Sequence, residues 1–190
     1  KVAGVVVHLG KMSKGTTLAA GCLVDARVAG ARRELTAKNH SATHLLNQAL
    51  REVLGDHVAQ QGSEVDSERL RFDFSNPKGL TPEEIDQVEA IVNRQIIQNS
   101  AVEVTEENLD EARARGVVAA FGEKYGERVR VVDMGAWSTE LCGGTHVKAL
   151  GDIGSFKIVS ESSIGSNIRR IEAITGAAPI ERLRQAETTL

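Results

Sequence analysis

Between residues 39 and 54, apolar side chains recur at the spacing of an amphipathic helix. They advance by i, i+3, i+4 and i+7, so they share one helical face. Asn39 is a suitable N-cap, and Gly55 is a suitable residue to follow the last turn. We therefore predict a helix over residues 39–54 whose apolar face consists of Ala42, Leu45, Leu46, Ala49, Leu50, Val53 and Leu54.

Three further segments have helical patterns. Thr81-Pro82-Glu83-Glu84 forms a capping box with proline at the first helical position, so we predict a helix over 82–98. A short helix is expected over 107–115, ended by Gly116. Apolar residues resume a helical rhythm after Pro179 and continue to Leu190 without a cap, which predicts that 177–190 begins a linker helix of a longer parent chain.

Extended segments with β-branched residues lie between these helices. Strands and helices that alternate irregularly favour an α+β fold over a repeating βαβ series. Residues 1–30 have two extended runs and predict a small N-terminal β subdomain, followed by a larger sheet-and-helix body over 31–176. The predicted strands are Val5-Val6-Val7, Thr16-Thr17, Cys22-Leu23-Val24, Leu70 to Phe74, Ala101 to Val104, Val129 to Asp133, Phe156 to Ser160 and Ile168 to Ile174.

Two short motifs place potential metal ligands four residues apart. They are His40-Ser41-Ala42-Thr43-His44 and Cys142-Gly143-Gly144-Thr145-His146. On a helix, four residues advance the angle by only about 40°, so His40 and His44 share a face. The apolar stripe of the same helix is centred about 220° from His40. A histidine of the core would share the apolar face, so this placement favours a separate function for the pair.

The second motif is expected to be a tight loop, because two consecutive glycines destabilise a helix. A thiolate and three imidazoles form a tetrahedral donor set well suited to zinc, and nothing in the sequence specifically indicates iron or copper. Two simpler interpretations remain: a solvent-facing His pair without a metal, and Cys142 as a small buried apolar residue. A zincin-type protease is excluded, because Ser41 stands where that motif requires glutamate.

The composition narrows the class of protein. Of 190 residues, 41% are hydrophobic and 26% charged, and the net charge is −3, which excludes a uniformly basic nucleic-acid binder but not a local basic stripe. Two distant cysteines exclude a disulfide scaffold and fit a reducing, cytoplasmic location. No apolar run approaches the roughly 18 residues that a membrane-spanning helix needs. Because the chain begins with Lys1, we expect it to be part of a longer protein.

Five motifs occur in an order typical of one family: H-S-A-T-H-L-L, R-F-D-F-S, F-G-E-K-Y-G, E-L-C-G-G-T-H and R-R-I-E-A-I-T-G. Over about residues 20–176 the chain closely resembles the editing domains of bacterial alanyl-tRNA synthetases. It is more distantly similar to the editing domain of threonyl-tRNA synthetase and to free-standing editing proteins. One departure is Asn167, which stands where relatives usually have glycine before I-R-R.

The resemblance implies hydrolysis of the ester bond in Ser-tRNA(Ala) and Gly-tRNA(Ala), with tRNA(Ala) and the rest of the synthetase as partners. It implies no aminoacylation by this chain, which has no recognisable ATP-binding motif. It also implies that Thr43 and Gln60 belong to the substrate pocket, that Arg169 lies near the RNA 3′ end, and that one zinc ion is held by His40, His44, Cys142 and His146.

Two further roles are expected from the residue types. The backbone N–H groups of Gly143 and Gly144 would help to bind the oxyanion. Phosphate contacts would come from basic residues, namely Arg51, Arg69, Arg71, Lys124, Arg128, Lys157, Arg169 and Arg170. Two alternative functions remain open: a zinc-stabilised RNA-binding module without turnover, and threonyl-type editing of Ser-tRNA(Thr).

Overall fold

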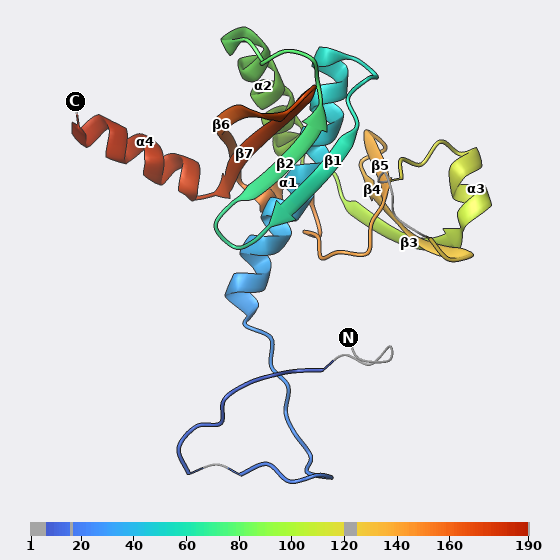
Figure 1. The fold of residues 1–190 in the computed structure, drawn as a ribbon, viewed down its shortest axis with the longest axis vertical. Coiled ribbons are helices and arrows are strands. Elements are labelled where there is room, and N and C mark those ends of the chain that lie inside the picture. Colours follow the sequence, from blue (N-terminus) through green and yellow to red (C-terminus); the bar gives the residue numbers. More distant parts are fainter. Residues whose placement is uncertain (1–6, 16, 120–124, 190) are drawn as a thin grey trace.

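The computed structural model describes residues 7–15, 17–119 and 125–189, and it has the predicted α+β fold (Figure 1). A long helix, α1, crosses the molecule between two antiparallel sheets. The elements are α1 (Gly30–Leu54), β1 (Gln60–Val65), β2 (Leu70–Ser75), α2 (Pro82–Gln98), β3 (Val102–Asn108), α3 (Leu109–Ala114), β4 (Arg128–Met134), β5 (Ser138–Leu141), a 3-10 turn (Leu150–Ile153), β6 (Ser155–Gly165), β7 (Ile168–Gly176) and α4 (Ala178–Thr189).

The larger sheet holds the apolar face of α1. Its strand order is β1-β2-β7-β6, and α1 and α2 pack against it. Phe72 and Phe74 of β2 point to the same side of the strand and are fully buried with Leu45 and Leu46 of α1. Burial of these four side chains fixes the rotation of α1 about its axis, and its histidine-bearing face therefore turns away from this sheet.

The smaller sheet, of order β3-β4-β5, lies against that other face of α1. The central strand, β4, contributes side chains to two cores, because successive side chains of a strand point to opposite sides. Val129 and Val131 pack with Ala112 of α3 in a small cluster, whereas Val132 and Met134 join the main core. The neighbouring strand β5 ends directly before Cys142 and so brings the second motif to α1.

The predicted N-terminal β subdomain is wrong where the structure describes it. Residues 7–15 and 17–29 contain no strand, and Leu9 and Leu23 are 94% and 102% exposed. Isolated strand pairs need an apolar face to pack against, and this segment packs against no core of the described chain. Val5, Val6 and Thr16 lie outside the described residues. The division of the chain at residues 30 and 176 stays a prediction.

Helix α1 begins nine residues before the predicted start, with Ala29 rather than Asn39 as its N-cap. The amide of Asn39 makes tertiary contacts instead: Nδ2 donates to the carbonyl of Asp66 at 3.0 Å, and Oδ1 accepts from Thr175 Oγ1 at 2.7 Å. The polar residue that resembled a cap therefore anchors the middle of α1 to β7. The predicted end at Gly55, with φ 112°, is confirmed.

The other predicted helices are confirmed within two residues at each end. Both hydrogen bonds of the α2 capping box form, with Thr81 N to Glu84 Oε2 at 2.8 Å and Glu84 N to Thr81 Oγ1 at 3.2 Å. Strands β1 and β5 were not expected from the sequence, because one is a polar edge strand and the other has four residues. Within the described ranges, no helix is both long and apolar enough to cross a bilayer.

Candidate metal centre

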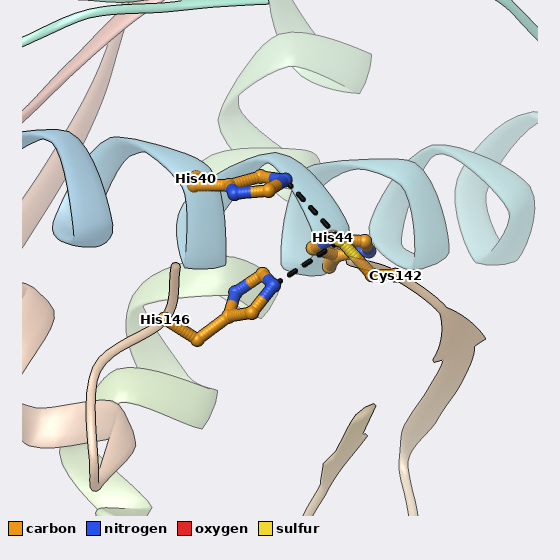
Figure 2. A group of neighbouring side chains, drawn as sticks. All are labelled: His40, His44, Cys142 and His146. Atoms are coloured by element: carbon orange, nitrogen blue, oxygen red, sulfur yellow. Dashed lines mark hydrogen bonds between the residues drawn. The ribbon is translucent and has the colours of Figure 1, made fainter. Parts of the chain in front are cut away.

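The two predicted motifs converge on one point (Figure 2). Each of His40, His44, Cys142 and His146 offers a ligand atom, and these four atoms lie within 4.8 Å of one another. Cys142 Sγ lies 3.5 Å from His40 Nε2 and 3.3 Å from His146 Nε2. Donors almost a hundred positions apart in sequence thus meet between α1 and the loop that follows β5.

Close approach of the loop to α1 depends on Gly144. A Cβ atom at this position would lie 2.0 Å from His40 Cε1, whereas a Cβ at Gly143 would meet nothing within 4 Å. The N–H of Gly144 donates to Cys142 Sγ at 3.4 Å, and Arg130 Nη1 donates to the carbonyls of Cys142 and Gly144, both at 2.8 Å. The loop is therefore held in a curved form that exposes its thiol to the histidines.

A buried carboxylate behind the cluster was not expected from the sequence. Glu140 Oε2 lies 2.6 Å from His44 Nδ1, and Oε1 accepts from Asn47 Nδ2 at 3.0 Å. His44, Asn47 and Glu140 are each no more than 8% exposed. The non-apolar face of α1 is thus covered by β5, and the His pair does not simply face solvent. The available signal was the E-L-C-G-G-T-H motif, which places a glutamate two residues before the cysteine.

Ser41 joins the two motifs from the other side. Its hydroxyl accepts from the Val147 N–H at 3.1 Å and lies 3.2 Å from His146 Nδ1. Because Ser41 is fully buried, these bonds satisfy its hydroxyl and fix the His146 ring. His146 and His44 both have their Nδ1 engaged, so each turns Nε2 toward the shared centre.

The electrostatics favour the ligand form of the thiol. Burial raises the pKa of Cys142, but hydrogen bonds from His146 and His40 and the charge of His44 outweigh it and hold that pKa at about 3. Burial lowers the pKa of His146. Burial also disfavours the charged form of His44, but the Glu140 carboxylate dominates and raises the pKa of His44 to about 10. In the metal-free chain the cluster is therefore a Cys142 thiolate facing a protonated His44.

This donor set fits a metal ion. His44 Nε2 is buried and has no hydrogen-bond partner among the described residues, although such atoms are normally satisfied. It points to the centre that the other three ligand atoms surround. A cation at that centre would replace the proton on His44 Nε2 and would be neutralised by the thiolate, so the residues present are compatible with a bound metal.

Two cavities flank the cluster along α1. The larger, about 590 Å³, is lined by residues of the 33–38 segment of α1 and by the 145–154 segment, including His146. The smaller, about 160 Å³, is lined by Asn47 and Arg51 of α1, together with Gln60 and Glu140. Since His40 and His44 lie between these segments, the cluster separates two spaces of different size and composition.

The two predicted pocket residues, Gln60 and Thr43, lie in different surroundings. Gln60 lines the smaller cavity and donates from Nε2 to Ser63 Oγ at 3.3 Å. Thr43 is buried in α1, and its hydroxyl donates to the carbonyl of Asn39 at 2.9 Å. Because the Gly144 N–H already donates to sulfur, the expected oxyanion contact is better suited to Gly143.

The predicted phosphate-binding residues are engaged within the protein. Arg169 makes two bonds to Glu161, at 2.5 and 2.7 Å, and Arg170 makes two to Asp73, at 2.7 and 2.8 Å. The turn before them is preserved, since Asn167 adopts φ 56°. Ion pairs also involve Arg51, Arg69, Arg71, Arg128 and Lys157. Lys124 lies outside the described residues, with most of the F-G-E-K-Y-G motif.

Comparison with known proteins identifies similar sequences. Residues 129–172 match the family model described as the threonyl and alanyl tRNA synthetase second additional domain. Alanine–tRNA ligases from Parvibaculum lavamentivorans, Pseudomonas entomophila and Pelotomaculum thermopropionicum are 56%, 52% and 52% identical over 93%, 98% and 100% of this chain. The chain spans 20–21% of the length of these relatives. The resemblance expected from the motifs is confirmed.

Proposed function

We propose that this chain, which is similar over nearly its whole length to one-fifth of an alanine–tRNA ligase, is an editing region that hydrolyses mischarged tRNA. Its substrates would be Ser-tRNA(Ala) and Gly-tRNA(Ala), and it would act beside the other domains of the synthetase. The observation that carries the proposal is the convergence of His40, His44, Cys142 and His146 between two cavities.

The four ligands would hold one zinc ion, for which a thiolate and three imidazoles are a typical donor set. When bound, zinc supplies positive charge that can polarise an ester carbonyl or fix the position of the substrate. Four protein ligands complete a tetrahedron, which is the mark of a structural rather than an open catalytic site. The proposal therefore assigns the ion to positioning of the aminoacyl adenosine.

The protein itself would contribute the remaining interactions. The Gly143 N–H would donate to the developing oxyanion, because the loop holds this residue exposed at the cluster. The amides of Gln60 and Asn47 in the smaller cavity would bind the serine hydroxyl. A site that hydrogen-bonds a hydroxyl disfavours the analogue without it, so cognate Ala-tRNA(Ala) would be spared.

One experiment tests the proposal against its alternatives. Amino-acid release would be measured from Ser-tRNA(Ala), Gly-tRNA(Ala), Ala-tRNA(Ala) and Ser-tRNA(Thr), with the zinc content of the same preparations. We expect hydrolysis of the first two only, and its loss together with zinc in Cys142→Ala. RNA binding without release would indicate a zinc-stabilised binding module, and preference for Ser-tRNA(Thr) a threonyl-type editor. Full activity without zinc would rule out the positioning role of the metal.

A further inference from the structure

The basic residues of the larger cavity differ from the predicted phosphate-binding residues in having no carboxylate partner among the described residues. Three cations line it, namely Arg33 and Lys38 of α1 and Lys148 of the loop. None of the three is in an ion pair with a carboxylate within the described chain, whereas every described member of the predicted phosphate-binding set is paired. These three positive charges are therefore available to a ligand.

Acidic residues in the cavity do not cancel this charge. Glu34 and Asp152 also line it. Oδ2 of Asp152 accepts the Ala149 N–H at 3.1 Å and so caps the 3-10 turn. Glu34 lies four residues before Lys38 on the exposed part of α1, and it forms no ion pair in the described structure. Three cations face two carboxylates, one of which is already engaged, so the cavity favours an anion.

The cavity is also correctly placed for an RNA strand whose 3′ end lies at the cluster. Cationic residues occupy positions 33 and 38 of α1, the metal ligands 40 and 44, and the smaller cavity begins at Asn47. At about 1.5 Å per residue, the first and last of these positions are about 20 Å apart along the helix. His146 lines the larger cavity and belongs to the cluster, so a ligand could extend from one to the other.

We propose that the cavity formed by Arg33, Lys38 and Lys148 binds the phosphates next to the 3′-terminal nucleoside of the RNA. This inference rests on the proposed function, since it takes the aminoacyl ester to lie at the cluster. The RNA strand then enters from the N-terminal half of α1, and the amino-acid side chain occupies the smaller cavity near Gln60. The Arg169–Glu161 pair joins β7 to β6, the Arg170–Asp73 pair joins β7 to β2, and neither binds phosphate.

The test measures binding of a defined probe by the whole chain. The probe is a single-stranded RNA tetranucleotide ending in adenosine that carries serine through an amide, which resists hydrolysis. In Lys38→Gln/Lys148→Gln we expect affinity to fall about fivefold or more, and the dependence of log K on log salt to decrease by about 0.7 per cation removed. Glu34→Gln should strengthen binding, an effect that misfolding would not produce.

Matched controls are Lys78→Gln and Arg94→Gln, which remove exposed cations outside the cavity. We expect both to bind the probe as the unmodified chain does. Equal binding by the double variant, equal losses in the controls, or no binding by the unmodified chain would overturn the phosphate site. Serine release from Ser-tRNA(Ala) is measured separately. If release is absent while RNA binding depends on the cavity, the hydrolytic function fails and the phosphate site remains.

Discussion

The two cavities beside the cluster lie along the same helix but differ in size and composition. The larger is open to the N-terminal half of α1 and is lined by cations without carboxylate partners. The smaller is bordered by the amides of Asn47 and Gln60 and by Glu140, which is already bonded to His44. His40 and His44 lie on α1 between the two cavities, so the proposed function assigns recognition of a polyanion to one side and of a small polar group to the other.

The difference also shows how each side is coupled to the cluster. On the side of the smaller cavity, Glu140 holds His44 at 2.6 Å, so that wall is rigidly connected to a ligand. On the other side only His146 is shared, and its partner Ser41 is buried within α1. We therefore expect changes in the smaller cavity to affect the metal, and changes in the larger cavity to affect RNA binding with the metal retained.

The largest effect on zinc binding is expected from a change that disrupts the cluster itself, which lies between the two cavities. Gly144→Ala places a methyl group 2.0 Å from His40 Cε1, and the ring can avoid it only by leaving the cluster. Zinc affinity should fall by at least about 100-fold and deacylation should be lost. Gly143→Ala is the control, since its Cβ meets no atom within 4 Å and should leave zinc binding intact. Zinc competition titrations of both variants decide the matter, and normal affinity in Gly144→Ala would contradict the close approach.

The next largest effect tests whether a residue that lines the smaller cavity influences zinc affinity. Glu140→Gln removes the carboxylate that orients His44, so zinc affinity should fall by about 10- to 100-fold. Glu106→Gln removes an exposed carboxylate paired with Arg128 and should leave the affinity unchanged. If the two variants bind zinc equally well, Glu140 does not position His44.

The same variant should alter the pH dependence of zinc binding. In the metal-free chain the pKa of His44 is about 10, so zinc must displace one proton at neutral pH. Affinity should rise about tenfold per pH unit between roughly pH 7 and 9, below that pKa. Without Glu140, only Cys142 still opposes the effect of burial, so the pKa of His44 should fall and the slope should flatten. Titrations in zinc buffers across this range measure both slopes, and identical slopes would contradict the role of Glu140.

A smaller effect, on substrate selectivity alone, is expected from a change in the smaller cavity. Gln60→Ala removes an amide from the wall that would bind the serine hydroxyl, so the rate ratio of Ser-tRNA(Ala) to Gly-tRNA(Ala) should fall by about tenfold. Zinc content and affinity for the amide-linked RNA should stay within about twofold of the unmodified chain. Gln61→Ala, its exposed neighbour on β1, serves as the control. An unchanged ratio in Gln60→Ala would remove this residue from the pocket.

The smallest effect on RNA binding is expected at the β6–β7 hairpin. Arg170→Gln leaves the buried Asp73 without its two bonds, so thermal stability should decrease. The salt dependence of RNA binding should not change, because the guanidinium is engaged by Asp73. Melting curves and salt titrations together distinguish the outcomes. A shallower salt dependence at unchanged stability would restore Arg170 as a phosphate ligand.

The sequence predicted the site better than its surroundings. His40 and His44 follow from helical periodicity, and the two glycines predict a loop near Cys142, so the four residues that converge could be named before the fold. Their burial could not be predicted, because β5 has four residues and little apolar pattern. Periodicity separates the two faces of α1, but it does not show that a second sheet covers the polar face.

The error at the N-terminus and the ion pairing of the two arginines share a physical cause. Residues 7–15 and 17–24 include β-forming residues, but strand propensity has little effect without a surface to pack on. Arg169 and Arg170 carry the right charge for RNA, but register on β7 places Arg170 opposite Asp73. In both cases the outcome depends on long-range pairing, which local residue patterns do not encode.

The most direct test of the metal centre is X-ray absorption at the zinc edge of the purified chain. We expect one bound ion with a first shell of one sulfur at about 2.3 Å and three nitrogens at about 2.0–2.1 Å. In Cys142→Ala the sulfur contribution should disappear. A chain that binds no zinc after loading, or a shell of nitrogen and oxygen without sulfur, would contradict a centre formed by His40, His44, Cys142 and His146.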